Sequence, residues 1–324
     1  MASSLWQRFP TINAQLQDLI AYLPTLIKSG NPAIDNRMKN LISSGGKLLR
    51  PGFFYMFAQL GQAADPKRLR SAAAAIELLH TATLIHDDVL DNADQRHGQP
   101  ALQIVTGNRT AIYAGDFLFT SYFTEILKAA ETREQIQTAN DIMRTILVGE
   151  LDQLALNFHT DATIRAYLNE IEGKTARLFS FAAGMGVALS HGDKATQTAA
   201  ESIGLSLGMA YQIRDDILDI IADPTAASKP VRHDLRQGVY TLPLLLASRK
   251  EPDWFESALA HPTNLTDQDV ITINNKIIAL DGPQEAEQQV QTYTSQALKL
   301  SQSLPAPIGN QLQHLLTTLL TRKS

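Results

Sequence analysis

Apolar residues recur at helical spacing along almost the whole chain, and this periodicity limits what the chain can fold into. Near the N-terminus the pattern runs through Leu16, Leu19, Leu23 and Leu26. The stretch 71–90 is rich in alanine and leucine and contains neither glycine nor proline. Residues three and four apart share one face of an α-helix. Alternating β patterns and Asn-Gly turns are absent from the sequence.

The same periodicity predicts an all-α protein of about ten or more helices. The further helical stretches cover roughly 107–130, 134–158, 161–190, 194–222, 240–249 and 308–322. The chain has 324 residues, of which 44% are hydrophobic, enough for one large core or two ordinary ones. Because no linker long enough to separate domains interrupts the helices, we predict one domain spanning residues 1–324.

The chain carries the same acidic cluster twice, at Asp87–Asp91 and Asp215–Asp219. Each copy is Asp-Asp, two aliphatic residues and Asp. In a helix the first and fifth residues share a face, with the second slightly to one side. Like charges at this spacing repel by roughly 0.2–0.5 kcal/mol per pair, and no lysine or arginine lies three or four positions away. The clusters therefore call for an external cation.

That cation is expected to be Mg²⁺, which accepts few carboxylate ligands and shares itself with water and substrate phosphates. The alternative is a pair of solvated acidic helix faces. Two near-identical copies flanked by leucine or isoleucine argue against that alternative.

Composition excludes several functions. The net charge is −5 without a basic run, which argues against nucleic-acid binding. The absence of cysteine excludes disulfides and thiolate chemistry. Met1–Pro10 does not resemble a signal peptide, and no apolar run approaches the roughly 20 residues of a membrane span. We expect a cytoplasmic protein with at most peripheral membrane contact.

Two polar, non-helical segments follow the acidic clusters. Residues 91–100 contain Arg96 and His97, whereas residues 223–238 contain four basic side chains. A basic loop beside a metal site could clamp a phosphate-bearing substrate and exclude water. An ordinary solvated connection is the alternative. The basic residues of the second segment are Lys229, Arg232, His233 and Arg236.

Several ordered motifs together resemble the trans-isoprenyl (polyprenyl) diphosphate synthases of medium- and long-chain type. The resemblance is strong from about Asn36 to Leu245 and weak at both ends. The matching segments are Gly45–Pro51, His80, His86–Asp91, Arg96, Ala114–Asp116, Gly149–Glu150, Lys174–Thr175, Gln212, Asp215–Asp219, Lys229–Pro230 and Asp234–Arg236.

The resemblance implies an isoprenoid synthase-type helical bundle around a central cavity, with the two acidic motifs facing each other at its mouth. It implies a prenyltransferase of isoprenoid biosynthesis that condenses isopentenyl diphosphate with an allylic diphosphate into an all-trans polyprenyl diphosphate. Roughly three Mg²⁺ ions per substrate-bound site are implied. The implied assembly is a homodimer, or a heteromer with a small subunit.

The resemblance also implies roles for individual residues. Asp87, Asp91 and Asp215 are expected to bind the metal. Lys47, Arg50 and His80 are expected to hold the diphosphate of isopentenyl diphosphate. The remaining expectations place Asp88, Asp216 and Asp219 with the catalytic carboxylates, Arg96, Lys174 and Lys229 on the allylic diphosphate, His97 in the substrate-binding set, and Thr175 and Gln212 near the developing cation.

Three positions depart from the family pattern. His97 stands where a second arginine is usual, Val239 replaces a basic residue, and Arg232 replaces a small one. Because histidine is mostly neutral at pH 7 and makes no bidentate fork to phosphate, we expect weaker diphosphate binding. Arg232 or His233 is predicted to compensate in part.

Product length is predicted from the helix that carries the first acidic motif. Thr83 and Ala82, four and five residues before Asp87, are small, where bulky aromatics stop elongation early in the family. Leu79 and Ile76 lie one and two turns deeper. They are the next candidates for residues that stop the growing product chain. We predict a product of about C30 to C40, suited to a quinone side chain. Ala82 could instead be a simple helix former in a packed interface.

Shorter farnesyl- or geranylgeranyl-length products, or a catalytic subunit inactive without its partner, are the alternatives within this family. A terpene synthase shares the first acidic motif, but its usual second metal motif differs from Asp215–Asp219. A non-catalytic subunit usually loses acidic residues, and here all six remain. The alternative that is not an enzyme is a plain helical scaffold or binding protein.

Overall fold

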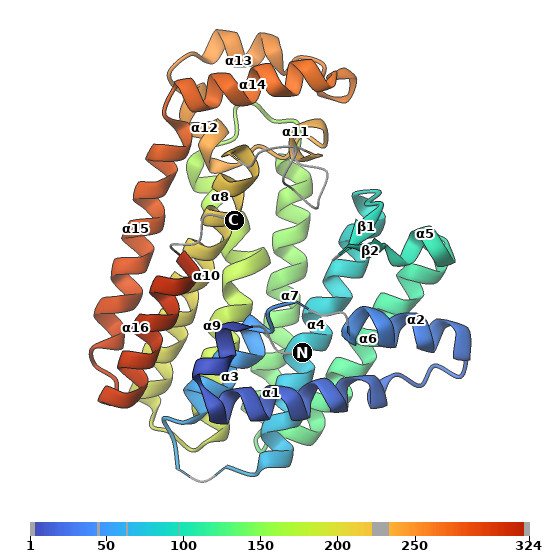
Figure 1. Cartoon of the computed structure of the whole chain (residues 1–324), viewed down its shortest axis with the longest axis vertical. Coiled ribbons are helices and arrows are strands. Elements are labelled where there is room, and N and C mark those ends of the chain that lie inside the picture. The colour runs from blue at the N-terminus through green and yellow to red at the C-terminus, as the bar shows by residue number, and fades with distance from the viewer. Residues whose placement is uncertain (1–3, 44–45, 63, 97, 222–232, 321–324) are drawn as a thin grey trace. The chain divides into compact units, whose positions relative to one another are not determined.

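The computed structural model describes residues 4–43, 46–62, 64–96, 98–221 and 233–320, and this part of the chain is almost entirely helical (Figure 1). The predicted all-α class is confirmed. The α-helices are α1 (Pro10–Tyr22), α2 (Pro32–Ser43), α3 (Leu49–Ala58), α4 (Pro66–Leu90), α5 (Leu102–Thr106), α6 (Asn108–Ala129), α7 (Arg133–Leu156), α8 (Ile164–Ile171), α9 (Arg177–Leu189), α10 (Lys194–Ile221), α11 (His233–Arg236), α12 (Leu242–Ser248), α13 (Pro252–Ala258), α14 (Asp267–Ala279), α15 (Gly282–Ser301) and α16 (Ala306–Leu320).

Shorter elements interrupt the helices. A π-helical turn, Glu172–Ala176, joins α8 to α9. The strands β1 (Gln95–Arg96) and β2 (Gln99–Pro100) form an antiparallel pair of two residues each. Both strands lie in the segment that was predicted to be non-helical. Three 3₁₀ turns span Ser4–Arg8, Leu23–Leu26 and Pro262–Asn264.

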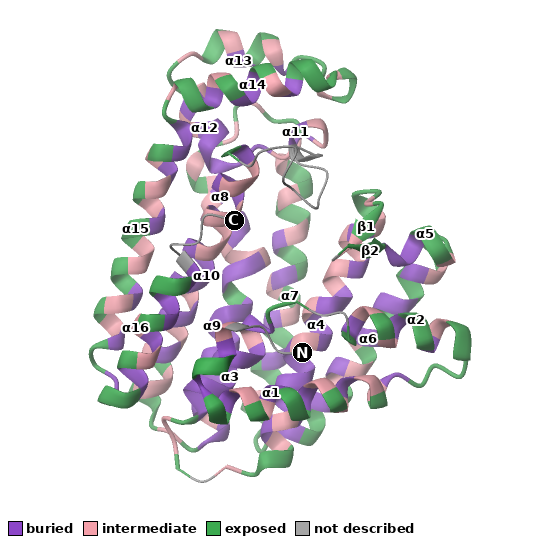
Figure 2. Cartoon of the chain, in the orientation of Figure 1, coloured by how far each residue is buried: buried purple, intermediate pink, exposed green. Residues whose placement is uncertain are grey.

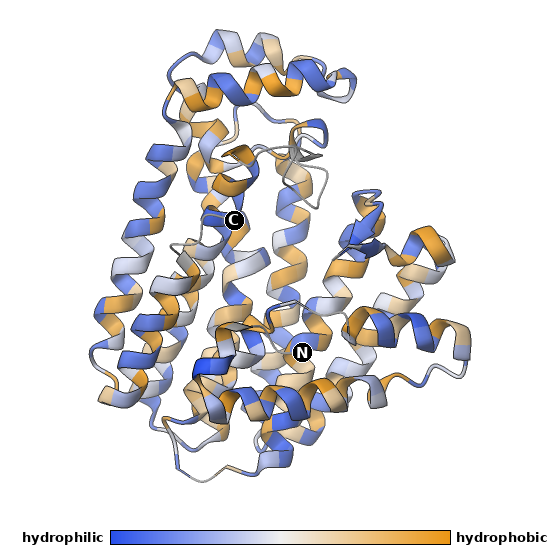
Figure 3. Ribbon diagram, in the orientation of Figure 1, coloured by the Kyte–Doolittle hydropathy of each residue, from blue (hydrophilic) through white to orange (hydrophobic). Residues whose placement is uncertain are grey.

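Local sequence signals set the helix boundaries. Asp65 caps α4 by accepting a hydrogen bond from the backbone N–H of Lys67 (2.9 Å), and Pro66 follows at the first helical position. Thr266 and Asp269 form a reciprocal capping box at the start of α14. Helices α2, α3, α5, α11 and α13 to α15 were not predicted. Figure 3 shows α15 as a largely hydrophilic helix, which explains the weak apolar pattern there.

The chain groups into two compact units. Unit 1 comprises Met1–Met143 and Phe181–Glu201, and unit 2 comprises Arg144–Ser180 and Ser202–Ser324. The chain therefore passes between them within α7, α9 and α10. The expectation of a single domain stays a prediction.

In unit 1, α4 is the central helix. It packs against α1, α3, α5 and α6, and Figure 1 shows α4 and α6 side by side. Ile76, Leu79, Ala82 and Ile85 of α4 have no exposed surface, and Figure 2 shows how much of this helix is buried. The alanine-rich sequence of α4 leaves room for neighbours on several sides, which suits a helix at the centre of a bundle.

In unit 2, α10 packs closely against the start of α9. A Cβ atom at Gly204 would lie 2.5 Å from the carbonyl oxygen of Phe179, and one at Gly208 would lie 2.5 Å from the Cα of Ala176. Backbone atoms cannot move aside cheaply, so these positions require glycine. These two glycines of α10 therefore serve tight helix packing. In the described part of the chain no helix is long and apolar enough to cross a membrane.

Candidate functional site

The first acidic motif lies at the C-terminal end of α4, where its three carboxylates have different environments. Asp87 is partly exposed and Asp91, just past the helix end, is exposed, whereas only 2% of Asp88 is accessible. Arg96 pairs with Asp88 through two nitrogens, and its Nε lies 2.9 Å from Oδ1. A buried carboxylate needs such a partner because desolvation otherwise destabilises its charge. For Asp88, therefore, the compensating cation belongs to the protein.

Gln103 holds the turn that follows this motif. Its Nε2 donates to the carbonyl oxygens of Asp88 (2.8 Å) and Ala93 (2.6 Å). These bonds tie α5 to the end of α4 and to the turn after it. The Asp88 carbonyl is one of those that the end of a helix leaves without an intrahelical partner. Sequence reasoning missed Gln103. The available signal was a polar residue between the apolar Leu102 and Ile104.

His86 explains the Ala114–Asp116 motif of α6. Its Nε2 lies 3.2 Å from the carbonyl oxygen of Ile112 and 3.4 Å from Oδ1 of Asp116. A Cβ at Gly115 would lie 2.5 Å from the same nitrogen. Glycine at this position therefore lets the imidazole approach α6 beside the first acidic motif.

Arg50 and His80, both expected from the resemblance to hold one diphosphate, contact each other in unit 1, with Nη1 of Arg50 3.0 Å from Nε2 of His80. Because a guanidinium only donates, Nε2 of His80 accepts. Lys47 is exposed, and its carbonyl oxygen accepts a 2.7 Å hydrogen bond from Nε1 of the buried Trp6. Sequence reasoning missed Trp6, which anchors the loop that carries Lys47.

The second acidic motif, in α10 of unit 2, also contains one buried carboxylate. Asp216 is 7% exposed, while Asp215 and Asp219 are partly exposed. Oδ2 of Asp216 accepts from the Tyr167 hydroxyl (2.5 Å), and Oδ1 accepts from Nε2 of Gln212 (2.8 Å). Burial raises the pKa of Asp216 to about 6, although these two hydrogen bonds lower it. Sequence reasoning placed Gln212 near this site but missed Tyr167.

Thr175 extends this network. Its hydroxyl donates to Oε1 of Gln212 at 2.9 Å. Thr175 belongs to the π-helical turn that interrupts the α8–α9 stretch, and such turns occur frequently at functional sites. The predicted neighbours Thr175, Gln212 and Asp216 are therefore brought together within unit 2.

Lys174 of the same turn faces α7. Its Nζ lies 2.7 Å from both Oε2 of Glu150 and Oε1 of Gln153. A Cβ at Gly149 would lie 2.5 Å from the Lys174 backbone nitrogen, so glycine there permits the close approach. Burial raises the pKa of Glu170 to about 8, partly offset by the positive charge of Lys174.

The remaining predicted basic residues are placed differently or lie outside the described residues. Arg214, which was not among the predicted residues, directly precedes the second motif and pairs with Glu287 of α15 (2.6 Å). Arg236 pairs with Asp267, and its Nε donates to the carbonyl oxygen of Leu265 (3.1 Å). The segment predicted to be non-helical contains the short helix α11 at this point. Outside the described residues lie His97, Lys229, Arg232 and the side chain of His233.

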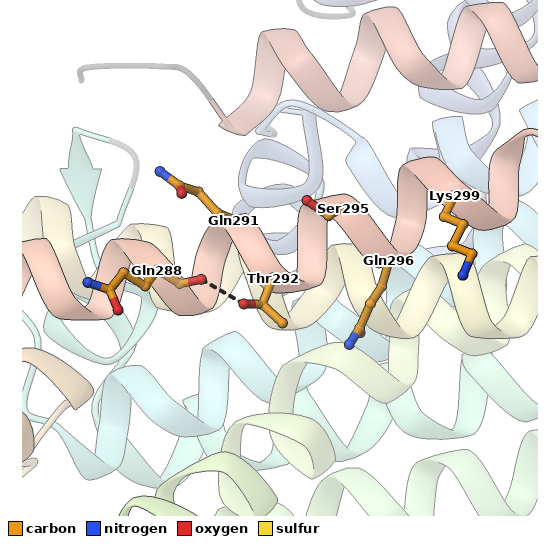
Figure 4. Close-up of a pocket in the computed structure, with 6 residues that line it drawn as sticks. All are labelled: Gln288, Gln291, Thr292, Ser295, Gln296 and Lys299. Carbon is orange, nitrogen blue, oxygen red and sulfur yellow. Dashed lines mark hydrogen bonds between the residues drawn. The ribbon is translucent and has the colours of Figure 1, made fainter.

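A pocket of about 590 Å³ lies against α15, and none of the predicted site residues lines it. Figure 4 shows its lining, which is mostly amide and hydroxyl side chains. Among the residues that the structure describes, no group of three acidic or histidine side chains could hold a metal ion by itself. The lining residues are Gln288, Gln291, Thr292, Ser295, Gln296 and Lys299.

Comparison with known proteins identifies the family. The model of the polyprenyl synthetase family matches residues 31–273, which is most of the chain and includes both acidic motifs. The chain belongs to the polyprenyl synthetase family.

Relatives and solved structures agree with this family. The chain is 33% identical to heptaprenyl diphosphate synthase component 2 of Geobacillus stearothermophilus over 82% of each protein. It is 44% identical to a crystal structure of a geranylgeranyl pyrophosphate synthase from Lactobacillus brevis, with a TM-score of 0.94 and coverage of 98% and 99%. The Staphylococcus aureus heptaprenyl diphosphate synthase is 32% identical, with a TM-score of 0.91 and coverage of 97% and 99%.

Membership in this family establishes the broad activity. This polyprenyl synthetase is a prenyltransferase, a trans-prenyl diphosphate synthase. The resemblance inferred from the ordered motifs is thereby confirmed.

Beside Arg50, the synthase carries an acidic group that the sequence did not single out. Glu77 lies one helical turn before His80 on α4. Burial raises the pKa of Glu77 to about 7, against a reference of 4.5, while the positive charge of Arg50 lowers it. Between these two values the folded state binds more protons than the unfolded state, so stability is lost as the pH rises through this range.

Replacing Glu77 with Gln should remove this loss, because an amide does not titrate. Denaturation midpoints are measured at about pH 5 and about pH 8. The stability of the variant relative to wild type should be greater at the higher pH. Glu134→Gln, at an exposed position of α7, is the matched control. An unchanged pH dependence in Glu77→Gln would contradict the account.

Proposed function

We propose that this synthase condenses isopentenyl diphosphate with an allylic diphosphate, in the presence of Mg²⁺, to give an all-trans polyprenyl diphosphate of about C30 to C40. One observation carries the proposal within the established family. In both copies of the acidic motif the second aspartate is buried and bonded within the protein, whereas the first and fifth remain accessible. Accessible carboxylates four residues apart are suited to a substrate-bound cation.

The donor set fits Mg²⁺. We propose that Asp87, Asp91 and Asp215 bind it, because carboxylate oxygens are its preferred ligands and it usually retains water and substrate phosphates as further ligands. The lack of a self-sufficient three-residue cluster in the described residues is compatible with such shared coordination. Bound Mg²⁺ supplies positive charge that neutralises the departing diphosphate.

The basic residues are proposed to bind the two diphosphates. Lys47, Arg50 and His80 serve isopentenyl diphosphate, and the Arg50–His80 contact supports a shared role. For the allylic diphosphate we propose Arg96 and Lys174, together with Lys229, which lies outside the described residues. Arg96 and Lys174 already neutralise Asp88 and Glu150. This pairing keeps each cation in place before a diphosphate arrives.

The proposed reaction needs no nucleophile from the protein. The carbon–oxygen bond of the allylic diphosphate breaks, and the electron pair leaves with the diphosphate. The double bond of isopentenyl diphosphate attacks the resulting allylic carbocation, and a proton is then lost. Thr175 and Gln212 are proposed to lie beside the developing cation, where fixed dipoles stabilise charge without reorganising.

Incubating the purified chain with Mg²⁺, farnesyl diphosphate and isopentenyl diphosphate tests this function. We expect prenyl diphosphates of about C30 to C40 when the products are resolved by length. Cyclic hydrocarbons would contradict prenyl elongation.

Two narrower alternatives have specific support. A C20 product would favour geranylgeranyl synthesis, in line with the name of the 44% identical structure. If the chain alone forms no product but does so with a small partner protein, a heteromeric catalytic subunit is favoured, in line with the component 2 relative. The absence of any prenyl diphosphate product with every partner tested would contradict the proposed function.

Apolar side chains left exposed support the proposal that the synthase works as a homodimer. Monomeric proteins rarely expose large contiguous apolar patches. In unit 2, α7 and the residues after it expose five large apolar side chains. They are Leu147, Val148, Leu151, Leu154 and Phe158.

Product length is proposed to depend on α4. Ala82 and the deeper Leu79 and Ile76 are all buried, while Thr83 is partly exposed and its hydroxyl donates to the His80 carbonyl oxygen (2.8 Å). If the growing chain runs past Ala82, the small side chain leaves it room. Leu79 and Ile76 would then contact the tail one to two helical turns further along, at about 1.5 Å per residue.

Ala82→Phe is expected to shorten the product to about C15 or C20, because its ring would fill space that the tail otherwise occupies. Chromatography of the dephosphorylated products measures this. Leu84→Phe is the control, since a residue two positions along points to roughly the opposite side of the helix. A folded Ala82→Phe enzyme with unchanged product length would refute this path for the tail.

A further inference from the structure

Three side chains in unit 2 form a hydrogen-bonded chain that leads to Thr175. Tyr167 of α8 bonds to Asp216 of α10 at 2.5 Å. Asp216 bonds to Gln212 at 2.8 Å, and Gln212 bonds to Thr175 at 2.9 Å. Tyr167 itself is buried, with 4% of its surface exposed. It is therefore a buried polar group without a role in the reaction described so far.

Only one assignment of donors and acceptors fits this series of hydrogen bonds. Both carboxylate oxygens of Asp216 accept, one from the Tyr167 hydroxyl and the other from Nε2 of Gln212. The amide oxygen of Gln212 must then face Thr175, because an amide has donors only on its nitrogen. Consequently the Thr175 hydroxyl donates its only hydrogen to Oε1 of Gln212. What Thr175 can present to a substrate is its oxygen lone pairs.

We propose that Tyr167 is a positioning residue for prenyl transfer, acting through Asp216 and Gln212 to keep the Thr175 oxygen turned toward the allylic carbocation. Tyr167 donates to Oδ2 and thereby holds the carboxylate in the rotation that presents Oδ1 to Gln212. Without that donor the carboxylate can turn, and Gln212 can offer its amide nitrogen to Thr175 instead. The threonine hydroxyl would then point its hydrogen, the positive end, at the cation.

The position of Thr175 strengthens this inference. Thr175 belongs to a π-helical turn that interrupts the helix, and Lys174 beside it is fixed by Glu150 and Gln153. Thr175 is also buried, so water competes little for its oxygen. In such surroundings a fixed dipole acts strongly on a developing charge. The inference rests on the proposed prenyl transfer and assigns one more residue to it.

The first test is Tyr167→Phe, which removes only the hydroxyl. We expect kcat to fall by about 10- to 100-fold, the effect of losing a partner that orients a reactive group, with little change in KM. Tyr122→Phe is the matched control. Tyr122 is also buried, and its hydroxyl donates to a backbone carbonyl, that of Ala139 in unit 1. It should lose comparable thermal stability and keep its kcat.

A double-mutant cycle separates positioning from simple packing. If Tyr167 acts through Thr175, then Tyr167→Phe should add nothing to the loss of kcat caused by Thr175→Val. Thr175→Ser, which keeps the hydroxyl, should restore most of the activity and the sensitivity to Tyr167→Phe. Additive losses in kcat would overturn the proposal. If Tyr167→Phe does not fold, Gln212→Met breaks the same chain and should match Thr175→Val.

A binding measurement supplies a readout other than turnover. The probes are two unreactive compounds: an allylic thiolodiphosphate, which is neutral at the reacting carbon, and an analogue with an ammonium group there. Calorimetry should show Tyr167→Phe weakening the ammonium analogue by about the factor lost in kcat, because that analogue resembles the transition state. The thiolodiphosphate should bind unchanged. Equal weakening of both would overturn the proposal.

These tests distinguish the inference from the proposed function. If the wild-type chain forms no prenyl diphosphate, the proposed function fails. If the wild type elongates prenyl chains and Tyr167→Phe matches it in kcat and in affinity for the ammonium analogue, only the role of Tyr167 fails.

Discussion

Both acidic motifs depend on the same constraint, which is that a carboxylate buried in a protein must be bonded within it. Asp88 meets this constraint through Arg96, and Asp216 meets it through Tyr167 and Gln212. In each copy the second aspartate is thereby tied into the fold. The first and fifth carboxylates are accessible by comparison. Under the proposed function, the same repeated sequence therefore supplies one carboxylate to the fold and two to cation binding.

The partners of these buried carboxylates link the motifs to their surroundings. Arg96 lies in the short β hairpin that follows α4, whereas Gln212 connects Asp216 to the π-helical turn with Lys174 and Thr175. Under the proposed function such prior arrangement favours the reaction, because charges and dipoles that are already oriented need not reorganise during it. Glycine at 115 lets α6 approach the His86 imidazole closely, and glycine at 149 lets α7 approach the backbone of Lys174.

The sequence predicted the helices and the chemistry better than it predicted the partners. Periodicity located α4, α6, α7 and α10, and the repeated aspartates indicated a cation site. By contrast Tyr167 and Gln103 were missed, because each acts on a residue far along the chain and has no local pattern. Arg96 lies eight residues after Asp88, beyond the reach of helix-face arguments. Only the folded backbone shows which polar residue faces which buried carboxylate.

The central claim is that the accessible aspartates act on diphosphate together with Mg²⁺. Calorimetric titration of inorganic pyrophosphate into the chain, with and without Mg²⁺, tests it most directly. The account predicts binding that requires Mg²⁺, disappears with a chelator and is strongly weakened in Asp215→Asn. Equal affinity for pyrophosphate in the presence and absence of Mg²⁺ would contradict it.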